Sequence, residues 1–191
     1  MKIIISFIFL YYSFFSILYG QSLKDSIYWN EELKLKISDF KGKPDSISYY
    51  KGSCSSVIII EKYNDGSLYP NFEVEAIFLP NESFLVLTGD QDIDNSLLEH
   101  ERLHFDITYL YVLKIKKSIK DLRTKRISEL DRYLEQIYTL FEARDIKQKQ
   151  YDKETLHGAI SSEQNIWNKM IYSELDSLLY SEIPLQCPSN D

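Results

Sequence analysis

The sequence predicts an α+β fold in which an N-terminal antiparallel sheet packs on three C-terminal helices. Two observations predict it. Segments with strand patterning follow one another between residues 25 and 90, and Gly and Pro are absent between Asp90 and His157, where helix-forming residues dominate. Strands followed by helices favour α+β over a parallel α/β sheet. We expect residues 21–191 to form a single domain, with 21–90 mostly strands and 91–182 mostly helices.

The first 20 residues have the pattern of a secretory signal peptide. Lys2 supplies a positive charge, Ile3 to Tyr19 is an apolar run broken only by three serines, and Gly20 offers a small residue before a cut. We therefore expect a secreted or periplasmic protein with no membrane contact after cleavage. An uncleaved membrane anchor is the alternative, because the run is near the lower length limit for a span.

Five segments of the first half have strand patterning. Several alternate apolar and polar residues, as a half-buried strand does, and Gly, Pro and Asn separate them. The expected strands are Ile27–Trp29, Leu33–Ile37, Ser55–Lys62, Phe72–Leu79 and Ser83–Thr88.

Three helices are expected in the second half. Ser96 and Glu99 have the spacing of a capping box, which predicts a helix start near Leu97. The expected helices cover about 97–120, 122–148 and 159–180. The middle of the first is apolar nearly all round, which indicates burial inside the domain.

Composition excludes one class of partner. The chain has 22 basic and 29 acidic residues, for a formal net charge of −7. An acidic surface repels phosphate backbones, so we expect no nucleic-acid partner. Export would place Cys54 and Cys187 in an oxidising environment, and the sequence leaves open whether they pair.

The segment from His100 to His104 reads His-Glu-Arg-Leu-His and lies inside the first predicted helix. A spacing of four puts both imidazoles on one helix face, where they can share a metal ion. Glu101 can reach a water on that metal and act as general base. The alternative is a pair of surface or satisfied core histidines, but two buried histidines without a shared partner would be costly.

A catalytic zinc ion needs a third protein ligand, with a fourth position left for water. His157 is the one remaining histidine, and it lies in a break between helices just before Gly158. A carboxylate one helix downstream is the alternative, and Glu135 and Glu142 lie at suitable distances along the chain. Because imidazole is the more common ligand where one is available, the sequence favours His157 as the third ligand, but it does not exclude the two glutamates.

Supporting residues are expected around the ligands, because a metal-bound imidazole usually donates its other N–H to an acceptor. Asp106, Asp152 and Glu154 are candidates for that acceptor. Tyr151 is a candidate donor to the oxyanion that develops on a scissile carbonyl.

These residues resemble a bacterial family without an established function that is described as predicted secreted zinc-dependent proteases. The resemblance rests on Leu97–Asp106, Tyr151-Asp152, Thr155, His157-Gly158 and Trp167-Asn168, and it covers roughly residues 28–180. It implies zinc ligands at His100, His104 and His157 and a catalytic Glu101. It implies little about the substrate.

The sequence therefore predicts a secreted zinc-dependent hydrolase with a zincin-like helix, acting as a metallopeptidase on peptide or protein substrates. Zinc-activated water would attack the amide, with Glu101 as general base. Two alternatives remain. One is an exported, non-catalytic zinc-binding or scaffold module, which a fourth protein ligand would favour. The other is an amidase acting on cell-envelope material.

Overall fold

The computed structural model describes residues 25–44 and 51–181. The predicted signal peptide over residues 1–20 lies outside these ranges. Cys187, the candidate disulfide partner of Cys54, lies outside them too. Cys54 is a free thiol among the described residues.

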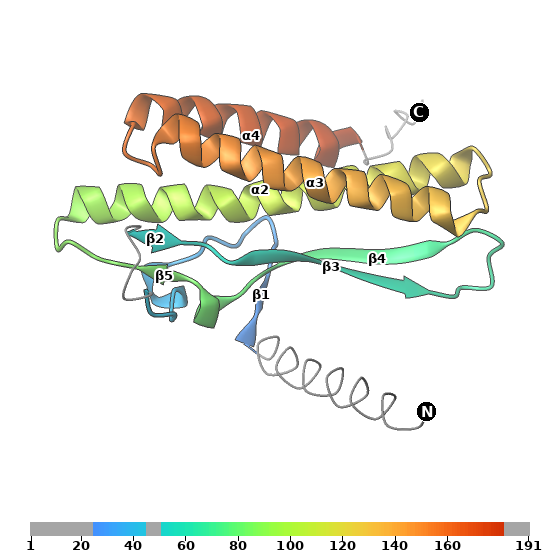
Figure 1. The fold of residues 1–191 in the computed structure, drawn as a ribbon, viewed down its shortest axis with the longest axis horizontal. Helices are drawn as coiled ribbons and strands as arrows, with labels where there is room; N and C mark the ends of the chain where they lie inside the picture. The colour runs from blue at the N-terminus through green and yellow to red at the C-terminus, as the bar shows by residue number, and fades with distance from the viewer. Residues whose placement is uncertain (1–24, 45–50, 182–191) are drawn as a thin grey trace, which may run out of the picture.

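The described chain forms a small sheet region followed by three helices, as the sequence predicts (Figure 1). The strands are β1 (Ile27–Tyr28), β2 (Gly52–Ser53), β3 (Ser56–Tyr63), β4 (Asn71–Phe78) and β5 (Phe84–Leu85). The helices are α2 (Gln91–Thr124), α3 (Leu130–Thr155) and α4 (Ser161–Ser181). Short 3₁₀ turns cover Ile37–Asp39 and Pro80–Glu82. The α+β prediction is confirmed.

The strands form two antiparallel sheets. The larger sheet has the order β1-β4-β3, and its long hairpin pairs Ile58 with Ala76 and Ile60 with Val74. The smaller sheet pairs Gly52 of β2 with Leu85 of β5. Alternation along β4 turns Val74, Ala76 and Phe78 toward the helices, and all three are buried.

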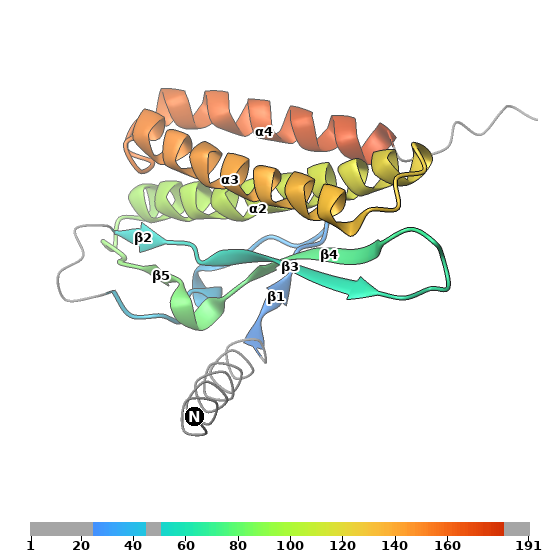
Figure 2. The same ribbon diagram turned by 45° about the vertical axis from the view of Figure 1, so that its right-hand side comes forward.

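Helix α2 lies between the larger sheet and the other two helices, with α4 farthest from the strands (Figure 2). One apolar cluster fills the space between α2 and the strands, and it includes Phe105, Val112 and Ile115. A second cluster, with Leu103 and Leu110, joins α2 to α3 and α4. Burial on two faces explains why the middle of α2 is apolar nearly all round.

The start of α2 differs from the prediction. The helix begins at Gln91, and Asp90 caps it by accepting hydrogen bonds from the backbone N–H groups of Asp92 and Ile93. The prediction that Ser96 caps the helix was wrong, because Ser96 is an exposed residue inside it. Asp at this position satisfies the unpaired N–H groups that any helix start leaves.

The segment Leu33–Ile37 was predicted to be a strand and is not one. Its alternation buries Leu35, which is 2% exposed. The carbonyl oxygen of Leu35, however, accepts a hydrogen bond from the Arg102 side chain at 2.6 Å, instead of pairing with a neighbouring strand. The alternation in this segment therefore indicates a buried residue, Leu35, but not a strand.

Within residues 25–44 and 51–181, none of the helices combines the length and the apolar run that a membrane crossing requires.

Candidate metal centre

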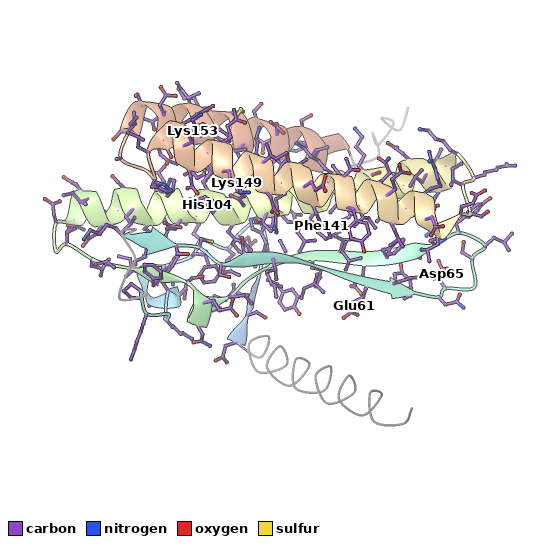
Figure 3. All side chains as sticks on the ribbon, viewed as in Figure 1. Glu61, Asp65, His104, Phe141, Lys149 and Lys153 are labelled. Carbon is purple, nitrogen blue, oxygen red and sulfur yellow. The ribbon has the colours of Figure 1, made fainter. Side chains whose placement is uncertain are left out.

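The motif residues His100, Glu101 and His104 lie in the N-terminal half of α2. Figure 3 labels His104 on this helix. The side chain of His100 is 1% exposed and that of His104 is 12% exposed. Their Nε2 atoms lie 3.3 Å apart, as the spacing of four residues predicts. Both imidazoles therefore direct one nitrogen to a common point.

Asp152, near the end of α3, occupies that common point. Its Oδ1 atom lies 3.2 Å from Nε2 of His100 and 2.9 Å from Nε2 of His104. The sequence predicted Asp152 only as a supporting residue. Its carboxylate instead lies among the histidine nitrogens, where a ligand atom would lie.

His157 joins the same cluster from the turn after α3. Its Nδ1 lies 3.3 Å from Oδ1 of Asp152, and its side chain is 49% exposed. One nitrogen or oxygen atom from each of His100, Asp152 and His157 lies within 4.8 Å of the others, so this group can hold a metal ion. His157 therefore lies at the solvent side of the cluster, whereas His100 is buried and His104 is only 12% exposed.

An unusual turn brings His157 back to the helix. Leu156, His157 and Gly158 all have positive φ angles, of 48°, 52° and 82°. Residues other than glycine seldom adopt this region, so two in succession carry strain of about 1–3 kcal/mol each. Gly158 packs so closely on His100 that a Cβ atom there would lie 2.9 Å from the Cβ of His100.

Two glutamines fix the orientation of the buried imidazoles. Gln164 of α4 presents Oε1 to Nδ1 of His100 at 3.1 Å. Gln148 of α3 presents Oε1 to Nδ1 of His104, while its amide donates to the main-chain oxygen of His104. Because these oxygens only accept, each Nδ1 carries a hydrogen, and each Nε2 is left to bind a metal ion or, when the ring is protonated, to donate to Asp152.

Tyr151 supports His100 from behind. Its ring stacks on the imidazole with centroids 4.5 Å apart, and its hydroxyl lies 2.8 Å from Oε1 of Gln164. Tyr151 is fully buried and does not line the site cavity described below. The structure therefore places Tyr151 as a positioning residue, and not where the predicted oxyanion donor would lie.

The spacing of these atoms fits a tetrahedral metal site. In a tetrahedral zinc site with bonds of about 2.0–2.1 Å, neighbouring ligand atoms lie about 3.3 Å apart. The three separations among His100, His104 and Asp152 run from 2.9 to 3.3 Å. Two imidazole lone pairs and a carboxylate oxygen this close repel one another unless a proton or a metal ion lies among them.

The pKa shifts of the cluster also favour positive charge among these atoms. Burial raises the pKa of Asp152, but hydrogen bonds with His100 and His104 outweigh it and hold that pKa well below its usual range. Burial lowers the pKa of both imidazoles. At His104 the hydrogen bond and charge of Asp152, with the charge of Glu101, prevail and raise the pKa, whereas His100 stays below its usual value. The cluster therefore favours positive charge, from a proton or a metal ion.

Glu101 lies beside this cluster. Its side chain is 4% exposed, and burial raises its pKa to about 7 against a lowering influence of His104 and of the Cys54 backbone N–H. Gly52 of β2 packs directly on the Glu101 carboxylate, which leaves no room for a side chain at position 52. The smaller sheet therefore forms the wall opposite α2.

A cavity of about 440 Å³ opens onto Glu101 and the cluster. Residues of β2, α2 and α3 and the turn after α3 line it. The lining residues are Gly52, Ser53, Cys54, Ser56, Phe84, Glu101, His104, Arg144, Gln148, Asp152 and His157.

Other residues singled out from the sequence lie elsewhere. Glu135 pairs with Arg132 on the surface of α3, and Glu142 is exposed, so neither alternative third ligand reaches the cavity. Asp106 accepts hydrogen bonds from Trp29 and Tyr172.

Glu154 also serves a different contact, since it accepts a hydrogen bond from the indole N–H of Trp167. Asp106 and Glu154 therefore support packing around α2 and α4, and not the imidazoles.

Sequence reasoning missed the two glutamines and the direct position of Asp152. One signal was available for part of this: Gln148 and Asp152 are four residues apart, so they share one face of α3. Gln164 had no such signal, because its contact with His100 depends on how α4 packs.

The fold and the cluster together define an α+β protein with a candidate His/Asp metal site. Residues 91–158 match the model of a family described as a bacterial protein of unknown function (DUF922). The match runs from the first residue of α2 to Gly158 and so contains His100, His104, Asp152 and His157. The chain matches no curated protein and no solved structure.

Proposed function

We propose that the protein is a secreted zinc-dependent hydrolase that cleaves peptide bonds. One observation carries the proposal: Glu101, buried on α2, lines the same 440 Å³ cavity as His104, Asp152 and His157. A general base beside a candidate metal site, with room for a substrate, is the arrangement that metal-assisted hydrolysis requires.

The residues of the site have three roles in this proposal: they bind the metal ion, transfer a proton, and hold the general base in place. His100 and His104 would hold the ion through Nε2, with His157 or Asp152 as further ligands. A bound zinc ion supplies a Lewis acid and lowers the pKa of a water ligand. Glu101 accepts a proton from water in the cavity as the water oxygen attacks the carbonyl carbon, and it returns that proton to the leaving nitrogen as the C–N bond breaks. The backbone N–H of Cys54 and the wall at Gly52 hold the Glu101 carboxylate in place.

The position of the Asp152 carboxylate among the histidine nitrogens supports a second candidate function. If Asp152 and all three histidines bind the ion together, four protein ligands close the site, which is typical of structural zinc. The separations of 3.2 and 2.9 Å from Asp152 to the two buried histidines favour this arrangement. An exported zinc-binding module without turnover is therefore the competing proposal.

The decisive experiment compares the wild type with Glu101→Gln. Bound zinc is measured in both proteins, together with hydrolysis of a mixed peptide library and of cell-envelope material. We expect both to bind one zinc ion and only the wild type to turn over, with a rate at least about 100-fold above the variant. Glu142→Gln, an exposed carboxylate on α3, is the control and should match the wild type.

The outcomes separate the candidates. Peptide hydrolysis that is equal in the wild type and Glu101→Gln would end the hydrolase proposal. Stoichiometric zinc with no turnover of any substrate would favour the structural module. Turnover of cell-envelope material alone would keep the role of Glu101 and identify an amidase.

A further inference from the structure

The wall that α3 contributes to the cavity carries one basic residue. Arg144, Gln148 and Asp152 follow one another at intervals of four, so they lie along one face of the helix. All three line the cavity, and Arg144 is the basic side chain among the lining residues apart from the histidines. The acidic residues of the lining, Glu101 and Asp152, both belong to the metal centre described above.

Other basic residues of α3 lie outside the cavity. Lys147 pairs with Glu174 and lies over the ring of Trp167. Lys149 and Lys153 are exposed and do not line the cavity, and both are labelled on α3 in Figure 3. Arg144 is only 20% exposed, in contrast to these two lysines.

The one ion pair of Arg144 among the described residues does not explain its position. Nε and Nη2 both contact Oδ1 of Asp145, at 3.0 and 2.7 Å, and the Asp145 side chain is 56% exposed. Adjacent residues do not face each other on a helix, so this pair adds little to helix stability. A guanidinium has five N–H donors, so donors remain for a group inside the cavity.

We infer that Arg144 binds a carboxylate of the substrate. The inference rests on the proposed function and names its substrate class: peptides with an acidic side chain, or a C-terminal carboxylate, near the scissile bond. A guanidinium in a partly enclosed wall is suited to this group, because it donates two parallel hydrogen bonds to a carboxylate.

The spacing along α3 limits where that carboxylate lies. Arg144 precedes Asp152 by eight residues, or about 12 Å along the helix axis at 1.5 Å per residue. An extended peptide advances about 3.3–3.6 Å per residue. After allowance for the length of the Arg side chain, the carboxylate belongs to a residue about one to three positions from the bond that is cut.

The test measures binding as well as turnover. Zinc-loaded Glu101→Gln is titrated with two pools of fluorescent octapeptides that are identical except for one Glu or one Gln per peptide. Each pool is made with a free and with an amidated C-terminus. We expect the pool with a carboxylate to bind about tenfold more tightly than its neutral counterpart. Tighter binding of the Glu pool than of the Gln pool, with both C-termini amidated, would assign the side-chain carboxylate. Tighter binding of the free than of the amidated Gln pool would assign the terminal carboxylate.

Variants at position 144 test whether Arg144 causes the preference for peptides that carry a carboxylate. Adding Arg144→Gln should abolish the preference, and Arg144→Lys should keep part of it, because it keeps the charge but not the paired donors. Arg132→Gln, which removes an exposed arginine of the same helix, should leave the preference intact. Circular dichroism and zinc content establish that each variant is folded and loaded.

Two results would overturn the inference: equal binding of all four peptide preparations, or a preference for a carboxylate that survives Arg144→Gln. Failure of the proposed function looks different. In that case the wild type hydrolyses none of the peptides, whatever the binding preference is.

Discussion

Gln148 contacts His104 at both ends of the histidine: its side-chain oxygen faces Nδ1, and its amide donates to the main-chain oxygen at 2.9 Å. The same amide lies 3.2 Å from the hydroxyl of Thr108, one turn further along α2. One side chain of α3 therefore fixes both the ring orientation and the protonated nitrogen of a candidate metal ligand on α2.

Replacing Gln148 by Leu should weaken zinc binding about 10–100-fold, since the acceptor that orients His104 is lost while the volume is kept. Competition with a chromogenic chelator measures the affinity. Gln150→Leu is the control, because Gln150 lies on the exposed face of α3 and bonds Glu154. Equal affinities for the two variants would remove Gln148 from the site.

Asp152→Asn should reduce zinc affinity more than Gln148→Leu does, because it removes a negative charge that contacts two histidine nitrogens directly. Zinc at 100 times its dissociation constant stabilises a folded protein by about 2.7 kcal/mol, so thermal unfolding with zinc and with a chelator reports the loss. Lys153→Gln, at the exposed neighbouring position, should keep the full zinc-dependent shift. A normal shift in Asp152→Asn would show that the carboxylate does not bind the metal.

Gly158→Ala should both destabilise the fold and weaken zinc binding. The φ angle of 82° costs an alanine about 1–2 kcal/mol, and its Cβ would push against His100. Gly66→Ala is a matched control, with a φ of 79° and nothing within 4 Å of the added Cβ. We expect the control to lower stability only. If both variants bind zinc normally, contact between position 158 and His100 does not matter to the site.

Asp90→Ala should lower the free energy of unfolding by about 1 kcal/mol, because α2 loses the acceptor for two backbone N–H groups. Ser96→Ala should have almost no effect, since Ser96 is exposed within the helix. Urea unfolding compares the two. The reverse order would restore the helix start that the sequence predicted.

Asp94 should contribute an acid-sensitive part of the stability. The hydrogen bond from the Thr88 backbone, supported by those from the Thr88 hydroxyl and the Gly89 backbone, outweighs the effect of burial and holds the pKa of Asp94 below the usual value. A lowered pKa in the folded state gives stability that is present above about pH 4 and is lost as the pH falls further.

The melting temperature of wild type should therefore exceed that of Asp94→Asn at pH 7, and the gap should narrow by pH 3. A gap that is independent of pH would mean that the hydrogen-bond geometry matters and the charge does not.

Patterns that depend on near neighbours were predictable from the sequence. The spacing of four between His100 and His104 predicted their shared face, and the alternation from Phe72 to Phe78 predicted the buried face of β4. The break between helices before Gly158 was also predicted, and in the structure a left-handed turn there places His157 against Asp152.

Features that depend on packing between distant segments were not predictable. Local spacing says nothing of the depth to which Asp152 enters the cluster, which depends on how α3 crosses α2. Gln164 reaches His100 across 64 residues of sequence. The alternation at Leu33–Ile37 was misleading for a related reason, because Arg102, far along the chain, takes the carbonyl oxygen that a strand would have used.

The two faces of α2 are held in different ways. Toward the strands, apolar packing against residues such as Val74 and Phe78 secures the helix. Toward α3 and α4, a group of polar side chains that includes His100, Asp152 and Gln164 interrupts the packing at one end. If this group binds an ion as proposed, loss of that ion should loosen the junction of α3 and α4 while the hairpin keeps its protection from local opening. The free energy of local opening of α3 and α4 would then depend on the concentration of available metal, whereas that of the β3–β4 hairpin would not.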